Sequence, residues 1–174
     1  MNIFVLDTNP CSAARMHCDK HVVKMILESA QMLATRLHFN GSTEYFVEVS
    51  KIGANKLPKP LPMRYNSHPC VTWVLESPSN AEWLSRLLYH LCDEYEFRYG
   101  KQHAYHRLAD EMSTFLFNHH ESDPSDFAIA CGEISHGIIR ASPEVAVSLY
   151  RTYYKAEKFQ FAKWSGREIP EWFK

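Results

Sequence analysis

Two histidines, a lysine and a glutamate near the start of this chain have a spacing that aligns them on one side of a helix. These residues are His17, His21, Lys24 and Glu28. At about 100° per residue they fall within a stripe about 80° wide, and most of the remaining circumference is apolar, as in a buried helix. Because a buried ionisable group is costly unless it is paired or faces a wet cavity, we expect the stripe to line an internal cleft that serves as an active site.

The residue types in this stripe suit chemistry on a nucleotide or a base. Lys24, or the neighbouring Lys20, is a candidate nucleophile or phosphate ligand. Glu28 is a candidate general base or stabiliser of a developing positive charge, and His17 and His21 are candidate proton carriers or phosphate ligands. The sequence therefore predicts a polar catalytic or phosphate-binding cleft. The alternative is a buried hydrogen-bonded network that only fixes helix packing.

The spacing of the two histidines also matches helical zinc sites, in which two ligands stand four residues apart. The glutamate of the zinc-protease motif is missing, and a third ligand would have to come from elsewhere in the chain. The candidates for it are His68, Cys70, His119 and His120. We therefore expect no metal and no other cofactor, and we keep zinc at His17 and His21 as an alternative.

Two other segments carry residues that suit contacts with phosphate. One precedes a short apolar helix and contains Arg64, Asn66 and His68. Backbone N–H groups are free at such a loop-to-helix entry and favour anions. Asn66 and His68 would therefore close the site, and Arg64 would contact the backbone of a nucleic acid. The other segment interleaves aromatic and basic residues, which suits stacking and phosphate contacts through Arg151 and Lys155.

Composition narrows the class of protein. With 174 residues, 45% of them hydrophobic, the chain suits one domain over residues 1–174 and is too apolar for a disordered protein. No apolar run approaches the ~18 residues of a membrane span, and the first residues lack the basic start of a signal peptide. The five cysteines are scattered, as in proteins with free thiols, so we expect a cytoplasmic location. The net charge of −1 does not by itself indicate a nucleic-acid partner.

The elements that must position these residues are expected to be helices. Apolar periodicity and capping residues predict helices over residues 12–37, 70–76, 79–99, 102–118 and 142–163, and a shorter one over 43–52. Residues 2–6 are expected to form a short strand or an extended arm, and residues 164–174 an aromatic tail. Strand signals are nearly absent, so we predict an all-α fold, an irregular bundle of about five helices in a single domain.

The order of these features resembles the pyrimidine-dimer DNA glycosylases of phages, of the endonuclease V type. The resemblance rests on residues 1–6 as an arm, 14–17 as the start of the first helix, 68–73 as a central segment and 169–174 as the tail. Residues 17–25 are also typical of small phage proteins. The resemblance implies an all-helical glycosylase and AP lyase scaffold, with DNA as the substrate and a flipped base entering beside the first helix.

The resemblance also implies catalytic residues, and this sequence differs from the family at the positions that would carry them. That family uses its N-terminal amine as the nucleophile, exposed by removal of methionine before a small residue, together with a glutamate on the first helix. Here the second residue is Asn2, which favours retention of Met1. The corresponding turn of the helix carries His21 and Lys24, and the nearest carboxylate on the stripe is Glu28. We therefore expect the fold to carry over with altered catalytic residues.

Three functions are consistent with this sequence. The first is a DNA glycosylase-like enzyme that acts on a base or nucleotide, with Lys24 or Lys20 as the nucleophile. The second is a transferase that modifies DNA bases, of the amino acid:DNA type, in which the lysines and histidines would bind a pyrophosphate leaving group. The third is a non-catalytic helical binding module, because a net charge of −1 is poor for tight DNA binding.

Overall fold

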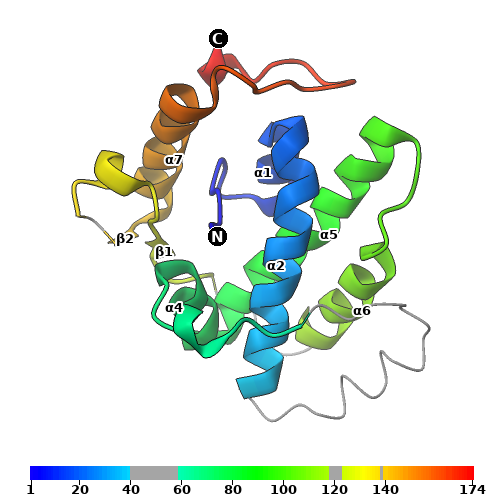
Figure 1. The fold of residues 1–174 in the computed structure, drawn as a ribbon, viewed down its shortest axis with the longest axis vertical. Coiled ribbons are helices and arrows are strands. Elements are labelled where there is room, and N and C mark those ends of the chain that lie inside the picture. Colours follow the sequence, from blue (N-terminus) through cyan, green and yellow to red (C-terminus); the bar gives the residue numbers. More distant parts are fainter. Residues whose placement is uncertain (40–58, 118–122, 138) are drawn as a thin grey trace.

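The computed structural model describes residues 1–39, 59–117, 123–137 and 139–174, which form six α-helices and one two-stranded sheet (Figure 1). The helices are α1 (Pro10–Met16), α2 (Asp19–Phe39), α4 (Pro69–Glu76), α5 (Pro78–Tyr99), α6 (His106–Phe117) and α7 (Pro143–Lys158). The strands β1 (Phe127–Ala128) and β2 (Arg140–Ala141) pair antiparallel. The prediction of an all-α fold is confirmed.

The first predicted helix, over residues 12–37, is wrong in one respect, because the structure has two helices there. The chain leaves α1 at His17, whose backbone is extended with φ −65° and ψ 136°. The guanidinium of Arg98, on α5, donates to the carbonyl oxygens of Arg15 and His17 at 3.0 and 2.8 Å. These carbonyls at the end of α1 are thus satisfied without a further helical turn. The spacing of His17 and His21 predicted that they lie on one helix, but the structure places His17 at the end of α1 and His21 on α2.

The other predicted helices are present with shifted ends. Helix α5 begins at Pro78, because the Oγ of Ser77 caps it by accepting from the backbone N–H of Ser79 at 3.2 Å. Gly100 follows the last residue of α5, in the left-handed region with φ 66° that favours glycine, so the helix ends at residue 99 as expected. Helix α6 begins later than residue 102 and α7 ends earlier than residue 163. The helix predicted over residues 43–52 lies outside the described residues.

The start of the chain lies in the centre of the molecule. Figure 1 shows the N-terminus between α2 and α7. Residues 2–6 form an arm that belongs to no sheet, which agrees with the predicted arm and not with a strand, but the arm turns at Val5, where the N–H of Leu6 donates to the carbonyl of Phe4 at 3.0 Å. The side chains of Ile3, Val5 and Leu6 are buried in the main core, so their apolar surface is removed from water on folding. Burial of the arm therefore places the first two residues of the chain next to helical side chains.

The C-terminal tail, residues 164–174, crosses the junction of α1 and α2. Its Trp164 indole donates to the carbonyl of Met16 at 2.9 Å, and its Arg167 pairs with the buried Glu94 of α5 at 2.6 Å. It ends in a 3₁₀ turn, η3 (Glu171–Phe173). Within the described part of the chain, no helix has the length and apolar character needed to cross a membrane.

Candidate active site

The carboxylate of Glu28 lies beside the N-terminus of the chain. The α-amino nitrogen of Met1 is 4.0 Å from Glu28 Oε1, and the backbone N–H of Asn2 donates to Glu28 Oε2 at 3.1 Å. From the same helix, Lys24 Nζ lies 3.5 Å from Glu28 Oε1. The Glu28 side chain is 15% exposed, whereas Lys24 is 58% exposed. An amine, a partly buried carboxylate and a solvent-facing ammonium thus meet at one point.

The side chain of Asn2 holds the N-terminus in this position. Its Nδ2 donates to the carbonyl of Ala130 at 2.9 Å, and its Oδ1 lies 2.9 Å from the hydroxyl of the buried Tyr150. The thiol of Cys70, on α4, is 3.7 Å from the same Oδ1. These contacts tie the start of the chain to three other parts far apart in sequence, so the position of the amine is a property of the folded protein.

His68 borders this site at the start of α4, where the charges of the N-terminus and of Glu28 act on it. His68 is the N-cap of α4, and its Nδ1 accepts from the backbone N–H of Cys70 at 3.2 Å. Burial, together with the nearby positive charge of the N-terminus, lowers the pKa of His68 below its ordinary value. The Oδ1 of Asn66 is buried, with no hydrogen-bond partner among the described residues. Burial raises the pKa of the Cys70 thiol to about 12, which keeps it protonated and makes it a poor nucleophile.

The two histidines of the predicted stripe are packed inside the protein. His17 is fully buried, and its Nδ1 donates to the carbonyl of Ala13 at 2.7 Å. His21 is 5% exposed, stacks on the ring of Phe4 at 4.6 Å between centroids and bonds through Nδ1 to the hydroxyl of Tyr154. This arrangement corresponds to the alternative of a buried network that fixes packing. A catalytic role for either histidine stays a prediction.

Neither of two cavities found among the described residues is lined by a residue of the stripe. One of about 470 Å³ is lined by residues that include Glu82 and Trp83. The other, of about 280 Å³, lies between α1 and the tail, at Arg15 and Arg167. No residue of the stripe contacts these two cavities, and the expectation that the stripe lines an internal cleft stays a prediction. Glu28 is reached from the surface beside the exposed Lys24 instead.

Acidification is expected to destabilise the protein through the two buried histidines. Desolvation by burial, the main cause, lowers the pKa of His17 from 6.5 to about 4 and that of His21 to about 3. The unfolded chain therefore binds more protons, and stability that is complete above pH ~6.5 is lost as the pH falls toward these values. The free energy of unfolding should fall by up to about 1.4 kcal/mol per pH unit for each histidine.

Urea unfolding at several pH values between about 7.5 and 4.5 measures this effect. A His21→Gln variant should show a weaker pH dependence than the wild type, and a variant of the exposed His38, His38→Gln, should keep the wild-type dependence. An unchanged pH dependence in the His21→Gln variant would contradict the assignment.

The remaining predicted contact residues are spread over the surface. Lys20 is exposed, with its Nζ 4.6 Å from the centre of the Phe161 ring, and Arg64 is exposed against Tyr65. Lys155 is exposed, and its Nζ is 3.3 Å from the carbonyl oxygen of the last residue. All three side chains are accessible to a polyanion.

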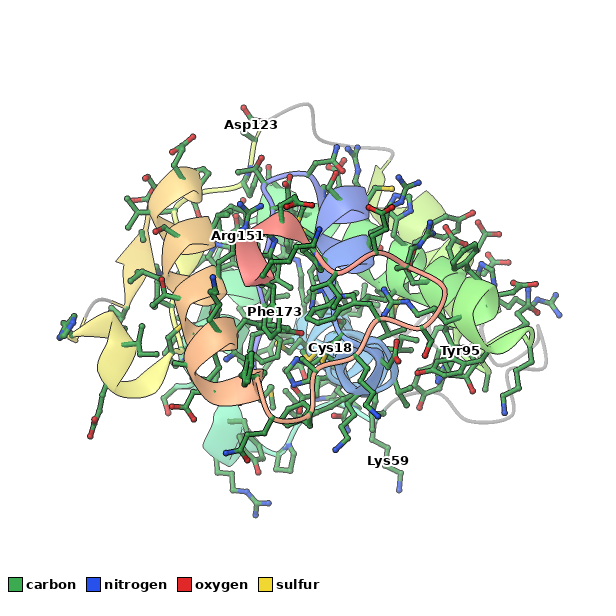
Figure 2. The ribbon with its side chains drawn as sticks, turned by 90° about the horizontal axis from the view of Figure 1, so that it is seen from above. Cys18, Lys59, Tyr95, Asp123, Arg151 and Phe173 are labelled. Atoms are coloured by element: carbon green, nitrogen blue, oxygen red, sulfur yellow. The ribbon has the colours of Figure 1, made fainter. Side chains whose placement is uncertain are left out.

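Arg151 holds the arm and the tail together. Its Nε donates to the carbonyl of Leu6 at 2.9 Å, its guanidinium lies 3.5 Å from Asp7, and it stacks over the Trp172 ring at 5.4 Å. Figure 2 shows Arg151 between α7 and the C-terminal segment. Its guanidinium is thus already engaged by protein groups, which suits a positioning role for the arm better than phosphate binding.

A zinc site is not assembled in the described residues. No group of three or more histidine, cysteine, aspartate or glutamate side chains there could hold a metal ion. The candidate ligands His119 and His120 lie outside the described residues.

The sequence predicted Glu28, Lys24 and His68 as site residues and left open whether the N-terminal amine takes part. Because Asn2 favours retention of Met1, the sequence favoured Lys24 or Lys20 as the nucleophile. One signal was available, because the apolar run over residues 3–6 predicts a buried arm, and a buried arm must carry its terminus inward.

A comparison with protein families completes the description of the site. A family model described as pyrimidine dimer DNA glycosylase matches residues 1–107, more than half of the chain. These residues include the arm, Glu28, Lys24 and His68. No curated protein and no solved structure matches the chain.

Proposed function

The chain belongs to the pyrimidine dimer DNA glycosylase family, and from this premise we propose that it excises a damaged pyrimidine from DNA with its N-terminal α-amine as the nucleophile. The observation that carries this proposal is the distance of 4.0 Å between the α-amino nitrogen of Met1 and Glu28 Oε1. A nucleophilic amine needs a group that accepts its proton, and a carboxylate close to hydrogen-bonding distance supplies one.

The reaction follows from this pair of groups. The amine attacks C1′ of the damaged nucleotide, the glycosidic bond breaks, and the base leaves with the bonding electrons. Glu28 accepts the proton that the amine loses and returns a proton as the sugar ring opens. The product is an imine between the amine and C1′, from which removal of a C2′ proton expels the 3′ phosphate. Borohydride reduces the imine to a stable covalent adduct.

The geometry favours the α-amine over Lys24 as the nucleophile. An α-amino group is ordinarily less basic than a lysine side chain, so more of it is the free base at neutral pH. Lys24 points to solvent and pairs with Glu28, and so is better suited to hold a substrate phosphate next to the carboxylate. Lys20, Arg64 and Lys155 are exposed cations for the rest of the DNA backbone.

Mapping the borohydride adduct is the experiment that tests this function. DNA with an abasic site or a pyrimidine dimer is trapped with borohydride, the protein is digested, and the modified peptide is sequenced by mass spectrometry. We expect the adduct on the α-amine of the first residue. An adduct on Lys24 Nζ would transfer the nucleophilic role to that lysine, and a chain that gives no adduct and cuts neither substrate would overturn the proposal.

Two lysine variants distinguish the auxiliary role of Lys24 from a general charge effect. Lys24→Ala is expected to lower excision roughly tenfold, because the loss of one charge-assisted contact costs about 1.5 kcal/mol. Lys20→Ala, one turn earlier on the same helix and equally exposed, should lower it much less. Equal losses at constant salt, measured as kcat/KM on dimer-containing duplex, would indicate that both lysines act only through overall charge.

A further inference from the structure

The most exposed of the large hydrophobic side chains in the described residues is Met63. It is 84% exposed and belongs to the 3₁₀ turn η1 (Met63–Tyr65). A flexible apolar side chain in full contact with water contributes nothing to the stability of the free protein. A single exposed hydrophobic residue is common, so its surroundings decide whether it has a function.

The turn presents Met63 on a fixed support. The backbone N–H of Tyr65 donates to the carbonyl of Pro62 at 2.9 Å, and that of Asn66 donates to the carbonyl of Met63 at 3.0 Å. Leu61 is tied to α2 through its N–H, which donates to Thr35 Oγ1 at 2.9 Å. The ring of Tyr65 packs partly buried against the core. Met63 therefore projects from a turn that is anchored on both sides.

The same segment leads directly into the candidate active site. Asn66 and His68 follow Met63 by three and five residues. The charges of the N-terminus and Glu28 both act on His68, and the Cys70 thiol is 3.7 Å from Asn2 Oδ1. The support of Met63 and the border of the site are thus one continuous piece of chain.

The charge of this segment suits a nucleic acid. From residue 51 to residue 75 the sequence has no acidic residue. Arg64 follows Met63 directly and is exposed, and Figure 2 shows Lys59 extending into solvent at the edge of the molecule. Cations that flank an exposed apolar tip match a DNA duplex, which offers phosphates outside and an apolar base stack inside.

We propose that Met63 inserts into the base stack of the DNA duplex next to the lesion and holds the gap left when a nucleotide leaves the stack. The inference rests on the proposed function, because attack on C1′ by an amine beside the partly buried Glu28 requires the duplex to open at the lesion. Proteins that unstack a base step commonly insert an apolar side chain, methionine included, in its place. Arg64 would contact the adjoining phosphate.

Comparison of duplex and single-stranded substrates tests this role. Met63→Ala is expected to lower kcat/KM roughly tenfold on a dimer in duplex DNA, because unstacking a base step is costly. The same variant should cut the dimer in single-stranded DNA at the wild-type rate, because no stack has to be opened. Met63→Leu, which keeps an apolar wedge, should restore most of the duplex activity.

A direct signal of unstacking comes from 2-aminopurine placed next to the lesion. Its fluorescence should rise when the wild-type protein binds, and should rise less with Met63→Ala at saturating protein. The matched control is Ile139→Ala, which truncates another exposed apolar side chain, at 63% exposure. It should behave as the wild type in both assays.

The outcomes separate this inference from the proposed function. If the wild-type protein forms no covalent adduct and cuts neither substrate, the proposed function fails. If the wild type is active and Met63→Ala matches it on duplex DNA, or loses the same activity on both substrates, then only the insertion of Met63 is overturned.

Discussion

A chain extended by two residues ahead of Met1 is expected to lose borohydride trapping completely and to cut dimer-containing DNA at the rate of the uncatalysed control. Two residues move the α-amine by up to ~7 Å, and the nitrogen of Met1 becomes a non-nucleophilic amide. The carboxylate of Glu28 then has no amine beside it. The measurement is the yield of covalent protein–DNA adduct with the extended chain.

The control for this variant is the same chain with a leader that a protease removes to leave Met1 first. Cleavage should restore trapping, which shows that the extension had not damaged the fold. In a second variant, Met1 is omitted and the cleavable leader directly precedes Asn2. Cleavage then yields a chain whose α-amine is the nitrogen of Asn2, which lies 3.1 Å from Glu28 Oε2 in the structure. Comparison of the two processed chains identifies which first residue carries the reaction. Full activity of the uncleaved protein would rule out the N-terminal amine.

Replacement of Glu28 by glutamine is expected to lower excision of the damaged base by about 10³-fold, in the range typical of a general acid–base group. The amide cannot accept the proton that the amine releases. Its carbonyl oxygen can still accept the hydrogen bond from the Asn2 N–H, so the arm should stay in place. Single-turnover excision of a dimer from duplex DNA measures the effect.

Thermal unfolding serves as the fold control for Glu28→Gln, because a variant that keeps its melting temperature has lost chemistry and not structure. Glu133→Gln removes an exposed carboxylate far along the chain and should excise the dimer as the wild type does. A Glu28→Gln variant with the activity of Glu133→Gln would show that the carboxylate beside the N-terminus takes no part in the reaction.

Both predictions treat catalysis as a property of two groups that the fold brings together. The ion pairs of Glu94 with Arg98 and Arg167 contribute to the position of these two groups indirectly. Arg98 ends α1 at His17, and Arg167 of the tail bonds to the same Glu94 carboxylate. The break between α1 and α2 thereby sets the direction in which α2 carries Lys24 and Glu28 past the N-terminus.

The sequence by itself determined the all-α class, because apolar periodicity and capping residues are local signals. It also determined which residues of α2 share a face, since Lys24 and Glu28 lie one turn apart in any helix that contains both. The apolar residues 3–6 predicted a short strand or an extended arm, with the two alternatives left open. These features depend on neighbours within a few positions of the chain.

Only the tertiary structure decided that His17 and His21 of the predicted stripe are buried and that Glu28 lies beside the N-terminal amine. His17 leaves the helix because Arg98, from a helix far along the chain, satisfies its carbonyl. The N-terminus reaches Glu28 because Tyr150 and Ala130 hold the side chain of Asn2. Contacts between residues so distant in sequence arise from packing of the whole chain, and no local pattern of residue types encodes them.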